Sequence, residues 1–244
     1  MKVLLIICLC LLALIIGYIL LLVIAALLVP PDREYEKHSR FYRILLNSAT
    51  GIAQVLIRIH MHTTGLEQLP KQERFVLVCN HRSKFDPILT WYVLSRYDIA
   101  FISKAENFKV PVFGRLIRKC CFLAIDRENP KNAMITIQKA AQLIINNQVS
   151  IGVYPEGTRS KTLELLPFHN GVFKIAQKAK VPVVIAAIQS TETIKSNYPW
   201  HRSHVYLDIL ETLPVDYVTT HKTSEIGERV RIKIENALQS KEEH

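Results

Sequence analysis

The N-terminal segment constrains this chain most, because the residues from Val3 to Val29 carry no charged side chain. A helix of that length would be about 40 Å long, which exceeds the roughly 30 Å thickness of a bilayer hydrocarbon core. A cleaved signal peptide has a shorter apolar region and ends in small residues, whereas this run ends in Leu-Val-Pro-Pro. The sequence therefore predicts a retained transmembrane helix, with residues 1–30 as a membrane anchor.

Basic residues flank this anchor unequally. Only Lys2 precedes the apolar run, whereas several basic residues follow it: Arg33, Lys37, Arg40 and Arg43. The positive-inside rule then places everything after Pro30 in the cytoplasm of a protein held in the cell membrane by a single span. The five cysteines suit a reducing compartment, because they show neither a disulfide framework nor the spacing of a zinc site.

Residues 31–64 combine this basic flank with a second apolar run from Ile44 to Ile59. Polar residues interrupt the second run too often for another full span. An interfacial or re-entrant helix is one interpretation, and an amphipathic helix packed on an ordinary core fits the pattern equally well.

The chain as a whole is basic, with 31 Lys and Arg against 21 Asp and Glu and a formal net charge of +10. Such a charge favours an anionic partner, which can be nucleic acid, anionic lipid or a phosphorylated substrate. Nucleic acid is disfavoured, because the basic residues are scattered and no recognised nucleic-acid-binding module is present.

After residue 65, apolar strand-like runs alternate with helical ones, which predicts a single α/β domain over residues 65–244. The expected strands lie near 75–79, 98–103, 122–126, 149–154, 182–188 and 204–212, and the expected helices near 87–95, 110–119, 132–146, 170–180 and 223–239. In open α/β sheets the ligand-binding site lies at the carboxyl ends of the strands, where the loops begin. Polar clusters follow three of these strands.

The first cluster is the loop Asn80-His81-Arg82-Ser83-Lys84-Phe85-Asp86, between a strand and a helix. The His81 imidazole can take a proton from a hydroxyl if a second group fixes its tautomer, and Asp86 can be that group. Asp86 precedes Pro87, however, so it can equally be a helix cap. A serine hydrolase that uses Ser83 is disfavoured, because the chain has no Gly-x-Ser-x-Gly elbow.

The second and third clusters follow later strands. Arg127 ends the segment Ile-Asp-Arg, and its guanidinium can hold a phosphate bidentately, although an ion pair with Asp126 or Glu128 is the simpler explanation. The segment Pro155-Glu-Gly-Thr-Arg-Ser160 forms either a turn with outward backbone donors or a plain tight turn with an exposed ion pair.

Taken in order, these segments resemble the glycerolipid acyltransferase superfamily, and within it the 1-acylglycerol-3-phosphate acyltransferases. The resemblance rests on His-x4-Asp at 81–86, Ile-Asp-Arg at 125–127, Pro-Glu-Gly-Thr-Arg-Ser at 155–160 and Val-Pro-Val-Val from 181. It also takes in Ser-Lys-Ala-Glu at 103–106, and it covers roughly residues 65 to 190. The chain departs from the family pattern at Ile185, where a second proline is frequent, and at His169-Asn170, where basic residues are frequent.

The resemblance implies a mixed sheet flanked by helices, and it implies a role for each matching residue. His81 would be the general base and Asp86 its orienting partner. Arg127 would bind the acceptor phosphate, and Lys104 would support that phosphate or the developing oxyanion. The remaining members of the acceptor site would be Glu156, Gly157, Thr158 and Arg159.

The implied reaction moves a fatty acyl group from a thioester, carried on coenzyme A or acyl carrier protein, to the sn-2 hydroxyl of 1-acylglycerol 3-phosphate. It needs no covalent enzyme intermediate, metal or cofactor. The partners are then a lysophospholipid acceptor, an acyl thioester donor and the membrane. Acylation of another lysolipid or of glycerol 3-phosphate remains open, and so does a membrane-tethered module that binds anionic lipid without catalysis.

Overall fold

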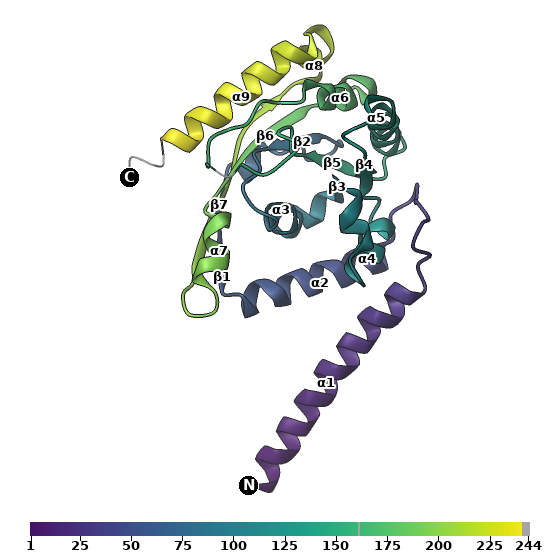
Figure 1. The fold of residues 1–244 in the computed structure, drawn as a ribbon, viewed down its shortest axis with the longest axis vertical. Helices are drawn as coiled ribbons and strands as arrows, with labels where there is room; N and C mark the ends of the chain where they lie inside the picture. The colour runs from purple at the N-terminus through teal and green to yellow at the C-terminus, as the bar shows by residue number, and fades with distance from the viewer. Residues whose placement is uncertain (161, 241–244) are drawn as a thin grey trace.

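A seven-stranded sheet forms the centre of the protein, in a computed structural model that describes residues 1–160 and 162–240 (Figure 1). Lys161 and the last four residues of the predicted domain lie outside the described residues. The strand order is β1-β7-β6-β2-β5-β3-β4. The strands are β1 (Ile59–Thr64), β2 (Val76–Cys79), β3 (Ile99–Lys104), β4 (Leu123–Ile125), β5 (Ser150–Val153), β6 (Val183–Gln189) and β7 (Ser203–Leu213).

Five neighbouring strands of this sheet run parallel, from β6 through β2, β5 and β3 to β4. Strand β7 pairs antiparallel with β6, and β1 pairs parallel with β7. The sheet is therefore mixed, and the predicted fold class is confirmed. Every residue of β2, β5 and β6 is buried, which explains why these strands read as continuous apolar runs. Because parallel strands end at the same edge, the polar loops after β2, β3, β4, β5 and β6 gather there.

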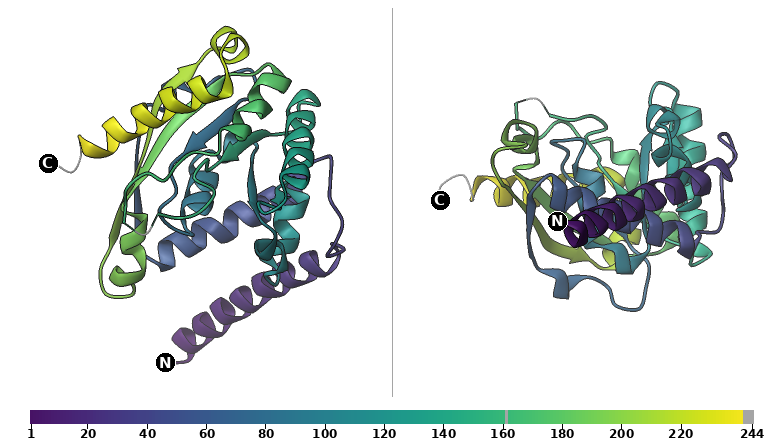
Figure 2. Two further views of the ribbon diagram at one scale, coloured as in Figure 1. Left: turned by 45° about the horizontal axis from the view of Figure 1, so that its top comes forward. Right: turned by 90° about the horizontal axis from the view of Figure 1, so that it is seen from below.

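Helices cover both sides of the sheet (Figure 2). On one side, α2 contacts both α3 and α4. Helices α5, α6 and α9 lie on the other side, where α5 packs on β4 and β5 and α9 packs on β6 and β7. The helices are α1 (Lys2–Leu27), α2 (Arg40–Leu56), α3 (Asp86–Val93), α4 (Phe113–Lys119), α5 (Pro130–Ile145), α6 (Lys174–Ala179), α7 (Ile194–Asn197), α8 (Val215–Thr220) and α9 (Thr223–Gln239).

Short 3-10 turns connect several of these elements. They lie at Leu66–Gln68, Ser95–Tyr97, Ala105–Lys109, Asn170–Phe173 and Thr191–Thr193. The predicted helix over 170–180 is accordingly a 3-10 turn followed by the short helix α6.

Helix α1 extends away from the domain and contacts it through its C-terminal half, where the hydroxyls of Tyr18 and Ser48 of α2 lie 2.8 Å apart (Figure 1). Ala25 and Ala26 are buried there, and the Tyr42 hydroxyl donates to the Ala25 carbonyl at 2.9 Å. Leu22 is partly buried against the core, whereas the N-terminal half of the helix leaves its apolar side chains exposed. By length and composition α1 fits a membrane-spanning helix, as the sequence predicts.

Helix α2 has two different faces. Tyr42, Leu45 and Leu46 are buried against the domain, whereas an opposite set of apolar side chains is exposed: Phe41, Ile44, Ile52, Val55 and Leu56. The buried face is that of an amphipathic helix packed on the core, and the interfacial or re-entrant interpretation stays a prediction for the exposed apolar face. In the sequence, Arg43 is among the basic residues that flank the membrane anchor. Its side chain is buried, however, and it donates to the carbonyls of Asp98, Ile99 and Cys120.

Strand β1 is an element that the sequence patterns did not predict. It begins at Ile59, after Arg58 takes a positive φ of 61°, and so the sheet starts before the expected domain boundary at residue 65. Its burial alternates, with His60 and His62 on the exposed face, because it is an edge strand paired only with β7.

Candidate active site

The loop after β2 is fixed to the neighbouring strand by Asn80. Its side-chain amide donates to the Ile188 carbonyl at 2.9 Å, and its side-chain oxygen accepts from the Ile188 backbone N–H at 2.8 Å. A buried amide that satisfies both backbone groups of one residue continues the ladder between β2 and β6 by one step. The next residue, His81, therefore leaves the sheet edge from a rigid position.

Asp86 is fully buried, at 0 % exposure, and its carboxylate holds the loop in shape. Oδ2 accepts from His81 Nδ1 at 2.8 Å, from the Arg82 backbone N–H at 2.7 Å and from the Ser83 backbone N–H at 2.8 Å. Oδ1 accepts from the Thr191 hydroxyl. Helix α3 begins at Asp86 itself, with Phe85 as its N-cap residue and no side-chain cap, so the carboxylate serves the histidine loop and not the start of the helix.

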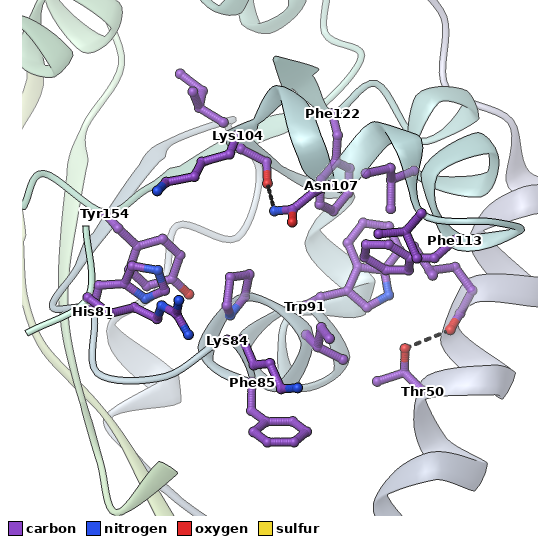
Figure 3. A pocket seen from close by; sticks show the side chains of 18 of the residues that line it. Thr50, His81, Lys84, Phe85, Trp91, Lys104, Asn107, Phe113, Phe122 and Tyr154 are labelled. Atoms are coloured by element: carbon purple, nitrogen blue, oxygen red, sulfur yellow. Dashed lines mark hydrogen bonds between the residues drawn. The ribbon is translucent and has the colours of Figure 1, made fainter. Parts of the chain in front are cut away.

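The partner of Nδ1 determines which imidazole nitrogen is available for chemistry. A carboxylate can only accept, so the proton of a neutral His81 ring lies on Nδ1, and Nε2 keeps its lone pair. The ring also stacks on Tyr154, with centroids 4.5 Å apart, and its side chain is 15 % exposed toward a cavity (Figure 3). This arrangement is that of a positioned general base.

Glu156 supports the same loop from the strand beside it. It is 3 % exposed, and its Oε1 accepts from the His81 backbone N–H at 2.6 Å while Oε2 accepts from the Leu166 backbone N–H at 3.0 Å. Burial raises the pKa of this carboxyl, and the two backbone donors oppose that shift. Glu156 is therefore neither in an exposed ion pair with Arg159 nor a lining residue of the cavity beside His81, and its contacts are those of a scaffold.

Gly157 turns the chain directly after Glu156. Its φ of 69° lies in the left-handed region, and its N–H donates to the Tyr154 carbonyl at 3.0 Å. A Cβ at this position would lie 2.9 Å from the His169 ring, so a larger residue would collide with it. The glycine thus allows the 155–160 turn and the His169 segment to approach each other.

Cationic side chains line the same cavity as His81: Lys84 from the His81 loop, and Lys104, Arg127 and Arg159 from other strand ends. The Arg127 side chain is exposed at the cavity, and partial desolvation lowers its pKa while the charge of Glu106 opposes that shift. Asp126 is engaged elsewhere, accepting from Asn132 Nδ2 at 2.8 Å and from the Glu128 N–H at 3.2 Å. Within the described part of the chain Arg127 has no ion-pair partner, so the simpler explanation from the sequence does not hold.

The cavity itself has a volume of about 600 Å³, within the range of roughly 300–1,000 Å³ that is usual for small-molecule sites. His81 and Tyr154 lie at one end, and Lys104 reaches over that end from β3 (Figure 3). Apolar side chains lie toward the other end: Trp91 of α3, Phe113 of α4 and Phe122 just before β4. Leu46 of α2 and Ile117 of α4 also line the cavity. The site therefore offers a base, an anion-binding rim with Thr158 beside it, and an apolar compartment.

Sequence reasoning missed three residues of this site. Asn80 was read only as part of the loop, Tyr154 only as the end of a strand, and Thr191 not at all. Thr191 is 105 positions from Asp86 in the chain, and no local pattern connects them. The one available signal was the polar stretch Ser190-Thr191-Glu192 after an apolar strand, the same arrangement that pointed to His81.

Comparisons with known proteins agree with this geometry. The chain is 27% identical over 191 residues to the 1-acyl-sn-glycerol-3-phosphate acyltransferase of Saccharomyces cerevisiae, a match that covers 77% of this chain and 62% of that protein. It is 26% identical to the 1-acyl-sn-glycerol-3-phosphate acyltransferase alpha of Homo sapiens, over 88% of this chain and 75% of that one.

The fold is that of a solved structure and of a sequence family. The crystal structure of the 1-acyl-sn-glycerophosphate (LPA) acyltransferase from Thermotoga maritima superposes with a TM-score of 0.69 at 24% identity, covering 83% of this chain and 80% of that one. The family model described as Acyltransferase matches residues 60–189. Because that match spans more than half of the chain, the protein belongs to the Acyltransferase family.

Proposed function

We propose that this protein transfers a fatty acyl group from an acyl thioester to the sn-2 hydroxyl of 1-acylglycerol 3-phosphate and so forms phosphatidic acid. The observation that carries the proposal is the hydrogen bond between His81 Nδ1 and Asp86, which leaves Nε2 free in a cavity with a cationic rim. Two relatives named as 1-acyl-sn-glycerol-3-phosphate acyltransferases support this acceptor.

The chemistry follows from the position of the imidazole. Nε2 of His81 takes the proton of the acceptor hydroxyl while that oxygen attacks the thioester carbonyl carbon. The new C–O bond forms, the C–S bond then breaks, and the departing thiolate takes the proton back from the imidazolium. Asp86 stabilises the imidazolium between these steps, and general-base help of this kind contributes about 10²- to 10⁴-fold in rate.

The cationic rim supplies the recognition of the acceptor phosphate. Arg127 can present two parallel N–H donors to phosphate oxygens, and Arg159 and Lys104 add positive charge from neighbouring strand ends. Binding the phosphate at a fixed place relative to His81 would orient the sn-2 hydroxyl toward Nε2. No residue in this scheme requires a metal or an organic cofactor.

The anchor suits a reaction between lipids. The acceptor and the diacyl product both reside in the bilayer, so a site held at the membrane by α1 and by the exposed apolar face of α2 need not extract either lipid into water. The basic residues between Lys104 and Lys131 would add about 1 kcal/mol each toward anionic headgroups near the surface. The catalytic domain would face the cytoplasm, where either acyl carrier protein or coenzyme A can deliver the donor.

A panel of acceptors tests the proposal. Purified full-length protein in nanodiscs is incubated with a labelled acyl thioester and, separately, with 1-acylglycerol 3-phosphate, other lysophospholipids and glycerol 3-phosphate. The proposal expects label in phosphatidic acid at the highest rate, and none with His81→Ala. Preferred acylation of another acceptor would replace the proposed substrate, and lipid binding without any transfer would favour the non-catalytic module.

A further inference from the structure

The connection between β6 and β7 carries aromatic side chains that the proposed chemistry does not use. Trp200 is 80 % exposed, and Tyr198 of the same turn is 52 % exposed. Trp91, the other tryptophan of the chain, is only 2 % exposed. Because an indole has a large apolar area, one that is left open on a domain surface beside other apolar side chains marks a contact site.

These aromatic side chains lie at the end of helix α2. The guanidinium of Arg58, just beyond that helix, donates to the carbonyls of Pro199 and Trp200 at 3.3 Å and 3.0 Å. At the C-terminal end of the helix, Val55 and Leu56 are 77 % and 69 % exposed, and they belong to its exposed apolar face. The turn therefore continues this apolar face past the end of α2.

The turn between α7 and β7 lies on the side of the domain from which α1 extends, whereas α9 lies at the opposite end (Figures 1 and 2). A bilayer that surrounds α1 is then on the same side as the turn. The turn is also held in place, because the Asn197 amide donates to the Arg202 carbonyl at 3.3 Å and to the Ser203 hydroxyl at 3.2 Å. The fold thus presents the aromatic side chains to the bilayer in a fixed direction.

The chemistry of the turn suits a lipid surface. Tyrosine and tryptophan are enriched at membrane–water interfaces, where the ring contacts hydrocarbon and its N–H or O–H stays among the headgroups. Lys195 and Arg202 are exposed on either side of the aromatic pair, and the segment from 195 to 202 has no acidic residue. Such basic side chains attract anionic headgroups.

We propose that Tyr198 and Trp200 form a further membrane contact, which enters the headgroup region of the bilayer and fixes the tilt of the domain about α1. The proposal goes beyond the proposed function, because it concerns where the domain rests and not what it acylates. Thr191, near the start of the same connection, donates to Asp86. The contact thus holds the edge of the sheet that carries the histidine loop close to the bilayer.

Tryptophan fluorescence tests the contact. The full chain is placed in nanodiscs of phosphatidylcholine and phosphatidylglycerol whose acyl chains carry bromine, a contact quencher, either near the glycerol or near the methyl end. Subtracting the emission of Trp200→Phe from that of the wild type isolates the Trp200 signal. The matched control adds Ile232→Trp to Trp200→Phe, because Ile232 is 48 % exposed on α9, at the end of the domain away from α1. Aqueous iodide is the second quencher.

Bromine near the glycerol should reduce the Trp200 signal about twofold or more, bromine near the methyl end should reduce it less, and iodide should have little effect. The indole introduced by Ile232→Trp should respond to iodide and not to bromine. A Trp200 signal that only iodide quenches would overturn the proposal. A signal that neither agent quenches would do so too, because protein would then cover the indole.

Activity gives a second readout. Trp200→Ala should lower kcat/KM about threefold for a long-chain acceptor in vesicles and leave it unchanged for a short-chain acceptor dissolved in water. The same result with both acceptors would contradict a role in tilting the domain. A wild-type protein that acylates no lysolipid would remove the proposed function, but the fluorescence test of the membrane contact would still decide this proposal.

Discussion

The loop that carries His81 and the rim that carries Arg127 face the same cavity, but their polar groups are satisfied differently. In the loop, Asp86 accepts from three donors through Oδ2 and from Thr191 through Oδ1, and Glu156 accepts from two backbone N–H groups. Across the cavity, the side chains of Lys104, Arg127 and Arg159 make no hydrogen bond or ion pair with the described part of the chain. The two carboxylates that hold the loop have their partners without substrate, whereas the rim has donors left for one.

This difference has a physical cause. A carboxylate with no exposure is stable only if its oxygens accept several hydrogen bonds, and Asp86 has them. Arg127 is exposed and forms no ion pair with the described residues, so its guanidinium donors are available to a ligand. We expect a bound phosphate to accept from these donors, so the rim would contribute binding free energy for the acceptor. In the proposed function, the loop therefore holds the catalytic geometry and the rim supplies the binding free energy.

His81→Ala should have the largest effect, because it removes the base and leaves the surrounding hydrogen bonds of the loop backbone in place. We expect kcat to fall about 10⁴-fold with an unchanged thermal unfolding midpoint. His201→Ala, at an exposed position, is the matched control and should keep wild-type turnover. Comparable activity in the His81 and His201 variants would show that the loop is not the catalytic part of the cavity.

Asp86→Asn should come next, with kcat reduced about 10³-fold. An amide can no longer stabilise the imidazolium, and its neutral oxygen accepts more weakly than a carboxylate from the three donors that now bond to Oδ2. Unlike His81→Ala, this variant should also lower the unfolding midpoint, because the buried hydrogen bonds from the Arg82 and Ser83 N–H groups lose their charge assistance. Loss of activity without any loss of stability would contradict the scaffold role of Asp86.

Glu156→Gln should reduce kcat by about tenfold, since it loosens the backbone position of His81 without touching the ring. It also gives a pH test. The folded pKa of Glu156 is raised by burial, so between the unfolded and folded pKa values the native state binds more protons than the unfolded state. The contribution of Glu156 to the free energy of unfolding is therefore fully present below its unfolded pKa and is lost as pH rises through its folded pKa.

The measurement is the free energy of unfolding of both proteins between about pH 4 and pH 7, which begins near the ordinary pKa of glutamate. The wild type should lose stability relative to Glu156→Gln as pH rises across this window. A relative gain would mean that Glu156 is stabilised as a charge, and the picture of a buried scaffold carboxyl would be wrong.

The smallest effect concerns the thiols behind the loop. Burial raises the pKa of Cys79 well above its ordinary value, that of Cys120 to about 12 and that of Cys121 to about 11. A maleimide at pH 8 should therefore leave Cys79, Cys120 and Cys121 unmodified in native protein, and turnover should change less than about twofold. Mass spectrometry identifies the sites, and modification of Cys79 would show that the strand before Asn80 opens.

The sequence predicted the parallel core of the fold well, because β2, β5 and β6 are buried on both faces and read as unbroken apolar runs. Strand β1 was not predicted, because it is an edge strand with His60 and His62 on its exposed face and so has no continuous apolar run. In the site, the close pair of His81 and Asp86 was visible because the two residues share one loop. Thr191 was not, because its contact with Asp86 depends on how β6 pairs with β2.

The central claim is that His81 and Arg127 act on one phosphorylated acceptor, and a comparison of two acceptors tests it most directly. The measurement is kcat/KM of the wild type and of Arg127→Ala for 1-acylglycerol 3-phosphate and for 1-acylglycerol, which lacks the phosphate. We predict a loss of about tenfold or more with the phosphorylated acceptor, through KM, and no loss with the other. An equal loss with both acceptors would contradict the account.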